Sequence, residues 1–221
     1  MTDSRAAQVA SWSKNAENWT AAVRSDAIAS RREATNAAIL AAALAAPLGK
    51  TLDVGCGEGW LCRELRNSTQ EIVGVDVSPE LISRAREEGG ATYDVLSYAE
   101  LCAEPARAGK DFDTIVCNFS LLDDRLEPIC DALAAISTPK ARLLIQTLHP
   151  LAFAPPYEDG WRIESFESFG GEKWAPMPYF ARTLGSWIEA ISKRWDLKRL
   201  LEPKIPSAPI PASLLLVAER R

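Results

Sequence analysis

The chain has 221 residues, a length that predicts one domain of ordinary size. Hydrophobic residues make up 47% and charged residues 25%, values close to the globular average that exclude disordered and fibrous classes. The formal net charge of -5 argues against electrostatically driven binding to nucleic acid or to an anionic membrane, because both need a basic footprint.

No membrane span, secretion signal or metal site is expected from the sequence. The longest apolar run, residues 37–48, is alanine-rich and contains Pro47, and a span needs roughly 20 apolar residues. The first residues lack a basic stretch leading into an apolar core. The five cysteines contain no Cys-x-x-Cys pair and fit neither a disulfide framework nor a zinc site. We therefore expect a reduced cytoplasmic protein that binds no metal.

Helices and strands are predicted to alternate along most of the chain. Alanine and long polar residues favour helix over residues 6–46, with a restart near Ser30. Short apolar runs predict strands at 51–54, 71–77, 91–95, 112–119, 142–148, 197–201 and 212–219. Helices are predicted at 60–66, after Ser78-Pro79, and at 97–103, 127–137 and 182–193. Five β–α alternations predict an α/β fold, in which helices cover both faces of a parallel sheet.

Residues 149–180 interrupt this alternation. They are rich in proline and aromatic residues and predict a long irregular segment. Such a segment is typical of a lid or binding loop, but its aromatic rings would equally cover an exposed face of the sheet. Both interpretations remain open at this point.

A glycine loop is the most informative segment. Gly55, Gly57 and Gly59 follow the strand that ends at Val54 and precede the helix that begins at Trp60. Glycines there let the backbone approach a ligand, and the helix N-terminus adds oriented N–H groups. A dinucleotide-binding fingerprint requires its third glycine where Trp60 stands, so the sequence disfavours a pyrophosphate packed on this helix.

Two carboxylates lie next to this loop. Asp53 is placed inside the strand end, where a buried carboxylate needs donors from a ligand ammonium or from loop amides. Asp76 ends the second predicted strand, where a carboxylate can accept hydrogen bonds from a ribose diol. The alternative role of Asp76 as a helix cap is better filled by Ser78.

These segments resemble a known family. Leu52–Leu61, together with Val75–Ser78, resembles the signature of class I S-adenosylmethionine-dependent methyltransferases of the small-molecule, type 11/12-like kind. Three further segments match its later strand motifs in order: Tyr93–Val95, Asp111–Asn118 and Lys140–Thr147. The resemblance implies a Rossmann-like seven-stranded sheet of order 3-2-1-4-5-7-6, with strand 7 antiparallel.

The resemblance also implies how the segments of a single methyltransferase domain follow one another along the chain. It gives residues 1–46 to a helical cap, 48–148 to the cofactor-binding core, 149–180 to a substrate lid and 181–221 to a C-terminal helix and strand pair. The cofactor residues that it implies are Asp53, Gly55, Gly57 and Gly59 for the methionine part, Asp76, Val77, Asp94 and Val95 for ribose and adenine, and Asn118 and Phe119 near the sulfonium. On the N-terminal helices it implies Trp12, Asn15, Trp19 and Arg24.

His149 is the candidate catalytic base. It is the only histidine and directly follows the fifth strand, where ligands of doubly wound sheets gather. The alternative is a histidine that ties the strand end to a neighbouring carbonyl. The candidate substrate residues are Tyr157, Trp161, Trp174 and Arg182. Arg182 would bind an acceptor carboxylate or phosphate, or else serve the start of a helix. Asp123 and Asp124 would line the acceptor site or cap a helix.

The function expected from this resemblance is methyl transfer from S-adenosylmethionine to oxygen or nitrogen of a small molecule, with S-adenosylhomocysteine as product. The partner is expected to be that small molecule, and the chain is expected to be a monomer or a homodimer. Nucleic acid is not expected as an acceptor, because residues 118–121 lack an Asn-Pro-Pro-aromatic motif. Two alternatives remain: a non-catalytic protein that binds the same cofactor, and, less favoured, an NAD(P)-dependent oxidoreductase.

Overall fold

The computed structural model describes residues 3–167 and 174–221. Its α-helices are α1 (Ser4–Arg24), α2 (Asn36–Leu44), α3 (Trp60–Leu65), α4 (Pro79–Glu88), α5 (Tyr98–Ala103), α6 (Leu126–Ala135) and α7 (Leu184–Ser192). A π-helical turn, η1 (Arg31–Thr35), precedes α2, and short 3₁₀ turns lie at η2 (Arg66–Ser68), η3 (Pro105–Ala108) and η4 (Pro150–Ala152). The strands are β1 (Lys50–Val54), β2 (Glu71–Asp76), β3 (Thr92–Val95), β4 (Phe112–Asn118), β5 (Ser137–Thr147), β6 (Gly160–Glu164), β7 (Met177–Ala181), β8 (Trp195–Leu201) and β9 (Leu214–Arg220).

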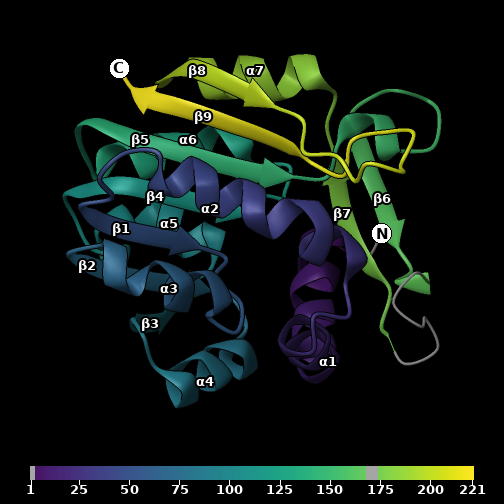
Figure 1. The fold of residues 1–221 in the computed structure, drawn as a ribbon, viewed down its shortest axis with the longest axis horizontal. Coiled ribbons are helices and arrows are strands. Elements are labelled where there is room, and N and C mark those ends of the chain that lie inside the picture. The colour runs from purple at the N-terminus through teal and green to yellow at the C-terminus, as the bar shows by residue number, and fades with distance from the viewer. Residues whose placement is uncertain (1–2, 168–173) are drawn as a thin grey trace.

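Seven strands form one mixed sheet of order β3-β2-β1-β4-β5-β9-β8 (Figure 1). All neighbours are parallel except β9, which runs antiparallel to both β5 and β8. With β8 and β9 counted as the sixth and seventh strands, this is the predicted order 3-2-1-4-5-7-6, so the fold prediction is confirmed. The predicted helix caps are also confirmed, since the Ser78 hydroxyl accepts the Leu81 N–H at the start of α4.

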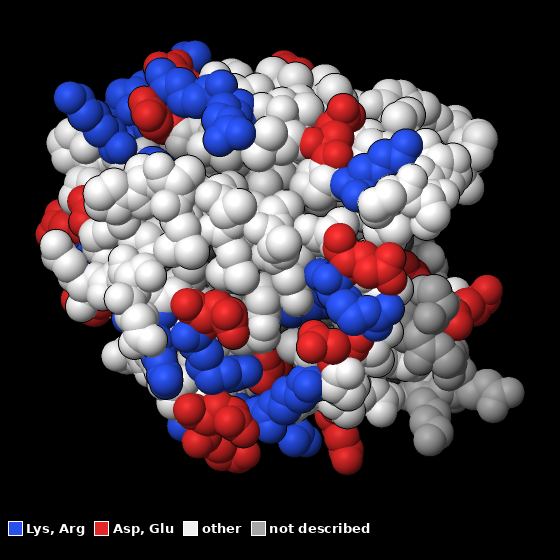
Figure 2. Space-filling view, viewed as in Figure 1, with Lys and Arg blue, Asp and Glu red and all other residues white. Residues whose placement is uncertain are grey.

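The sheet is buried on both faces because successive residues of its central strands point in opposite directions. Ile115 and Leu143 belong to the cluster that packs under α5, α6 and α7. Their neighbours Val116 and Leu144 belong to the cluster under α2, α3 and α4. In Figure 1, α2 and α3 lie in front of the sheet, and the molecular surface seen from this side is largely uncharged at its centre in Figure 2.

Helix α1 docks through polar side chains, which explains why its buried face is not apolar. Gln8 Nε2 donates to the carbonyl oxygens of Leu122 and Pro178, both at 2.9 Å. The Asn15 amide exchanges two hydrogen bonds with the Ala175 backbone, each of 2.8 Å. These amides satisfy backbone groups of β7 and of the segments next to it, which would otherwise be buried without partners. Helix α1 is thereby held beside the sheet, between it and the β6–β7 pair (Figure 1).

The segment 149–180 differs from the prediction of an irregular stretch. Strands β6 and β7 pair antiparallel as a separate two-stranded sheet. The buried side chains of Met177 and Tyr179 pack with Leu122 and against Trp12 of α1. The aromatic rings of this segment therefore support α1 and the loop after β4. The sequence did not predict β7 because it contains Pro178, and proline argues against a strand.

The glycine loop gives a test of the local packing. Gly59 caps α3 with φ +85°, and a Cβ there would lie 2.6 Å from Tyr93 Oη. We expect Gly59→Ala to lower the free energy of unfolding by about 2–4 kcal/mol, from backbone strain plus overpacking. Gly160→Ala is the matched control, because a Cβ at Gly160 meets nothing within 4 Å. Urea denaturation of both variants measures the difference, and equal stabilities would contradict this account.

Candidate functional site

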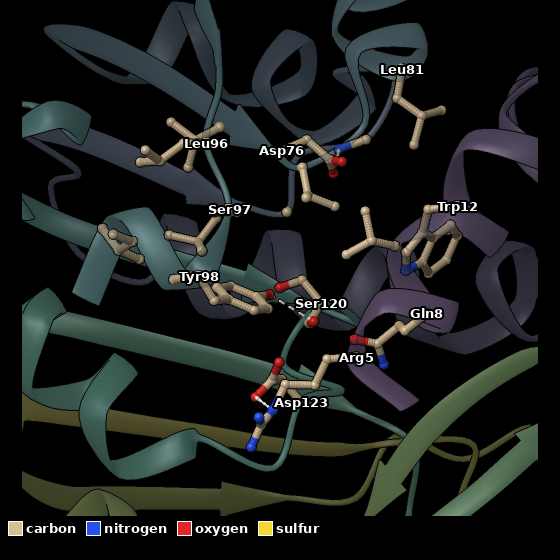
Figure 3. A pocket seen from close by; sticks show the side chains of 18 of the residues that line it. Arg5, Gln8, Trp12, Asp76, Leu81, Leu96, Ser97, Tyr98, Ser120 and Asp123 are labelled. Atoms are coloured by element: carbon tan, nitrogen blue, oxygen red, sulfur yellow. Dashed lines mark hydrogen bonds and ion pairs between the residues drawn. The ribbon is translucent and has the colours of Figure 1, made fainter. Parts of the chain in front are cut away.

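A cleft of about 570 Å³ lies between α1 and the carboxyl ends of β1, β2 and β4. This volume is within the range of small-molecule and cofactor sites. Its lining residues include, from α1, Arg5, Gln8, Val9, Trp12 and Trp19; from the loops after β1 and β2, Gly55, Gly57, Asp76 and Val77; and from the segments after β3 and β4, Leu96, Ser97, Tyr98, Phe119, Ser120, Asp123 and Arg125. Figure 3 shows many of these side chains from close by.

Asp76 joins the glycine loop to the end of β2. Its Oδ2 accepts the Gly57 N–H and its Oδ1 accepts the Ser78 N–H, both at 2.9 Å. Burial raises the pKa of Asp76, and these two backbone N–H groups oppose that shift. Each carboxylate oxygen has a second lone pair, so Asp76 can still accept hydrogen bonds from a diol in the cleft that it lines.

A small pocket beside the cleft, about 40 Å³ in volume, contains Asp53 and Arg31. Asp53 Oδ2 accepts the Cys62 thiol at 3.4 Å, whereas its buried Oδ1 has no hydrogen-bond partner among the residues that the structure describes. Burial raises the pKa of Asp53 to about 7. The Arg31 guanidinium lies 4.9 Å from the centre of the Trp60 ring. The pocket thus presents a carboxylate and a guanidinium, a pair complementary to an amino-acid zwitterion.

Arg31 is a site residue that sequence reasoning missed. The signal was the predicted restart near Ser30, because the chain folds back there and carries η1 over the glycine loop. Burial lowers the pKa of Arg31, and the Glu58 charge opposes that shift.

Of the four α1 residues that the resemblance implies for the cofactor, Trp12 and Trp19 line the cleft, whereas Asn15 and Arg24 do not. Trp19 lines both the cleft and the small pocket. Arg24 lines neither cavity: it pairs with buried Glu58 at 3.1 Å and with Glu88 at 3.0 Å. Glu58 also receives Arg63 at 2.7 Å. The structure therefore corrects the role of Arg24, which fastens α1 to the glycine loop from outside the cleft.

The third-strand residues are placed differently from the expectation. Asp94 is 58% exposed, faces Arg86 at 3.6 Å, and does not line the cleft; nor does Val95. Strand β3 is the outer strand of the sheet, so the Asp94 side chain turns to solvent. Leu96 and Tyr98, one to four residues later, supply this wall instead.

The predicted residues at the end of the fourth strand line the cleft. Asn118 and Phe119 both line it, and Phe119 has φ +55°, which redirects the chain after β4. Tyr98 crosses the cleft and donates its hydroxyl to the Ser120 carbonyl at 2.7 Å, as Figure 3 shows. The Ser120 Oγ is buried without a partner among the described residues. This end of the cleft therefore has polar atoms available to a ligand.

Two ion pairs close the far end of the cleft. Asp123 is 3% exposed and accepts Arg125 Nε at 2.9 Å and Nη2 at 2.8 Å. Burial acts to raise the pKa of Asp123, but the hydrogen bonds from Arg125 outweigh it and lower that pKa. Arg5 of α1 pairs with Asp124 at 2.7 Å. Asp123 thus lines the cleft, while Asp124 ties the loop after β4 to α1.

His149 lies away from the cleft. Its ring is buried, with Nε2 2.9 Å from Glu202 Oε1 and with Nδ1 accepting the Leu151 N–H at 3.2 Å. Because Nδ1 accepts, the ring proton sits on Nε2 and is donated to Glu202. His149 lines neither cavity, so the structure supports the structural alternative, a tie between β5 and the segment after β8.

The predicted substrate aromatics also lie outside the cleft lining. The Tyr157 hydroxyl accepts the Leu184 N–H at 2.9 Å, at the start of α7. Trp161 meets the Phe180 ring edge-on at 5.6 Å, and Trp174 stacks at 4.8 Å on a phenylalanine. These contacts stabilise the β6–β7 pair and its junctions.

Arg182 acts from behind the cleft wall. It is buried between the Phe180 and Trp187 rings, 4.8 and 5.3 Å from their centres. Its Nη2 donates to the Asp123 carbonyl at 2.5 Å, and burial lowers its pKa. Arg182 therefore supports the loop that carries Asp123 and makes no direct contribution to the cleft lining.

The described residues are 3–167 and 174–221. Within these ranges no group of three or more His, Cys, Asp or Glu side chains is placed to hold a metal ion. No helix in the same part of the chain has the length and apolar character needed to cross a bilayer.

Comparisons with known proteins agree with the geometry of the cleft. Residues 51–140 match the model of a family described as a methyltransferase domain. The chain is 34% identical over 114 residues to a ubiquinone biosynthesis O-methyltransferase of Xanthomonas euvesicatoria, covering 48% of this chain and 46% of that protein. The chain thus spans about half the length of the curated relatives it matches.

Solved structures share the fold over nearly the whole chain. A complex named DhpI-SAM-HEP superposes with a TM-score of 0.72 at 15% identity, covering 100% of this chain and 99% of that chain. A TehB-like SAM-dependent methyltransferase from Corynebacterium glutamicum gives 0.63 at 20% identity, covering 94% and 98%. These structures confirm the predicted fold, and the match to the methyltransferase-domain family over residues 51–140 contains the glycine loop and Asp76.

The placement of His149 leads to a prediction. We expect His149→Ala to lower the free energy of unfolding by about 1–3 kcal/mol, because the Leu151 N–H and the Glu202 carboxylate lose their partner and the buried ring leaves a cavity. Turnover should stay close to wild type. Glu202→Gln, which keeps an acceptor for Nε2, is the control. Urea denaturation and initial rates test this, and loss of turnover at unchanged stability would restore the catalytic-base hypothesis.

Proposed function

We propose that this chain, which contains an S-adenosylmethionine-dependent methyltransferase domain, transfers a methyl group from that cofactor to an oxygen or nitrogen atom of a small molecule. The observation that carries the proposal is the buried Asp53 Oδ1, which has no partner among the described residues and shares a pocket with Arg31. An unpaired buried carboxylate is costly unless a ligand supplies its donor.

The residues present fit S-adenosylmethionine. Asp53 would take the ammonium and Arg31 the carboxylate of its methionine part, while Asp76 would accept the ribose diol. The apolar walls from Leu81 and Leu96 would take the adenine. The glycine at position 55 lets the loop pass close to Ser120, since a Cβ there would overlap the Ser120 side chain.

The cofactor supplies an electrophilic methyl group, and the chain supplies alignment and exclusion of water. Helix α1 covers the cleft with Val9 and Trp12, which are apolar on that side. Asp123 has a lowered pKa and is therefore ionised at neutral pH at the cleft surface. A hydroxyl acceptor needs such a hydrogen-bond acceptor, whereas an amine attacks with little help.

The proposal of a small acceptor rather than a nucleic acid is supported by the surface charges. Lys193 pairs with Glu127 at 2.5 Å and Arg194 with Asp131 at 2.7 Å, so these basic side chains are already neutralised. In Figure 2 acidic and basic side chains are interspersed around the edge of the face shown. An oxygen acceptor agrees with the relatives named O-methyltransferases. We also propose, as expected from the sequence, a cytoplasmic protein that is a monomer or a homodimer.

Calorimetric titration with S-adenosylmethionine, S-adenosylhomocysteine and NAD(H) tests the proposal. We expect both sulfur ligands to bind in the micromolar range and NAD(H) not to bind. Methyl transfer to members of a small-molecule acceptor panel, followed by S-adenosylhomocysteine release, then separates an enzyme from a protein that only binds the cofactor. Binding of NAD(H) alone, or of none of the three, would refute the proposal.

The raised pKa of Asp53 predicts how cofactor affinity depends on pH. The ammonium needs an ionised carboxylate, and burial raises the pKa of Asp53 to about 7, so below that pH a proton must first be lost. We expect S-adenosylmethionine affinity to fall about fivefold from pH 7 to pH 6, and about tenfold for each further unit.

Substitution of Asp53 isolates this effect from that of Asp76, whose pKa burial also raises. Asp53→Asn should bind about 10- to 100-fold more weakly at pH 8 and lose the additional pH dependence. Asp94→Asn, at an exposed carboxylate outside the cleft, should behave as wild type. Calorimetry from pH 6 to pH 8 measures all three proteins, and an equal pH dependence in wild type and Asp53→Asn would contradict the assignment.

A further inference from the structure

Gln146 is a buried amide at the carboxyl end of β5 that belongs to neither cavity. It is 1% exposed and pairs in the sheet with Asn118 of β4. Its Nε2 donates to the Thr35 carbonyl oxygen at 3.0 Å and to Asn118 Oδ1 at 2.9 Å. Its Oε1 accepts the Ser213 hydroxyl at 3.5 Å. One side chain therefore connects η1, the end of β4 and the segment before β9.

The bond to Thr35 fixes the orientation of two amides. A backbone carbonyl can only accept, so the Gln146 atom that faces it must be the nitrogen. The second hydrogen of that nitrogen then requires an acceptor, so Asn118 must present Oδ1 to Gln146. The Nδ2 group of Asn118 is therefore available to donate to another partner, and Asn118 lines both the cleft and the small pocket.

The same bond holds the turn that carries Arg31. Thr35 ends η1, and the Asn36 N–H donates to the Arg31 carbonyl to close this π-helical turn. Such turns frequently mark functional sites, because they shift side chains out of regular helical register. With Thr35 fixed to β5, the Arg31 guanidinium is held over Trp60 in the pocket.

The backbone of Gln146 holds the next residue of the cleft wall. Its carbonyl accepts the Phe119 N–H at 2.6 Å. Phe119 has φ +55°, a conformation that a non-glycine residue keeps only when its surroundings enforce it. Gln146 thus holds Asn118 at the end of β4 through its side chain and the following Phe119 through its backbone, and both residues line the cleft.

We propose that Gln146 is a positioning residue for the cofactor. It presents Asn118 Nδ2 and the Arg31 guanidinium to the amino-acid end of the bound ligand without touching that ligand. This inference rests on the proposed function. It states that the buried Gln146 amide fixes the orientation of Asn118 and Arg31, which contact the cofactor.

The test uses S-adenosylhomocysteine as the probe in calorimetric titrations of the full chain. Gln146→Leu keeps similar volume but removes both donors, and we expect about tenfold weaker binding with the circular dichroism spectrum retained. Gln146→Glu should turn the Asn118 amide around and give a similar loss. The matched control is Arg142→Met: Arg142 also ties β5 to α2, donating to the Ala43 carbonyl at 2.6 Å, and this variant should keep wild-type affinity.

A double-mutant cycle separates positioning from general stability. In an Asn118→Ala background, Gln146→Leu should weaken binding by clearly less than tenfold, because one of the two groups through which it acts is already absent. Affinity within twofold of wild type for Gln146→Leu and Gln146→Glu would overturn the inference, as would losses that multiply independently in the cycle. Failure of the wild-type chain to bind either sulfur ligand would instead refute the proposed function, and the inference with it.

Discussion

The hydrogen bond from the Gly57 N–H to the Asp76 carboxylate joins the loops that follow β1 and β2, and the cleft depends on it. The adjacent parallel strands end at the same edge of the sheet, so their loops must be held apart at a fixed distance to leave space for a ligand. A backbone donor and a buried carboxylate do this without a bulky side chain. The left-handed φ of Gly57 directs its N–H in the loop, and Asp76 keeps lone pairs for a further partner.

The buried Asp53 carboxylate lowers the stability of the ligand-free chain. Burial raises the pKa of Asp53 to about 7 in the folded, ligand-free chain. As the pH rises from the ordinary aspartate pKa towards 7, the unfolded chain loses this proton before the folded chain does, so the free energy of unfolding falls. A ligand ammonium would offset this cost, because an opposite charge favours the ionised form. Stability and binding therefore oppose one another at this residue. Arg24 and Arg63, both bound to Glu58, stabilise the loop from the other side of the glycines.

The parts of the cleft lining that the sequence located are those set by local backbone chemistry. The glycine loop, Asp76 and the Ser78 cap each depend on residues a few positions apart. Asp94 was misplaced because strand position alone does not say which side of an outer strand a side chain faces. The role of His149 depends on Glu202, far along the chain, and no local pattern contains that contact.

One wall of the cleft comes from a part of the chain outside the matched family domain. Arg5, Gln8 and Trp12 lie on α1, outside residues 51–140, and line the cleft. Arg5 lies beside Asp123, and Trp12 lies on the side of Leu81 (Figure 3). Their position depends on amide-to-backbone hydrogen bonds to the β7 segment, which itself lies beyond residue 140. Similarity within 51–140 therefore does not extend to this wall of the cleft. The face of α1 over the cleft can therefore change its side chains while Gln8 and Asn15 keep the helix docked.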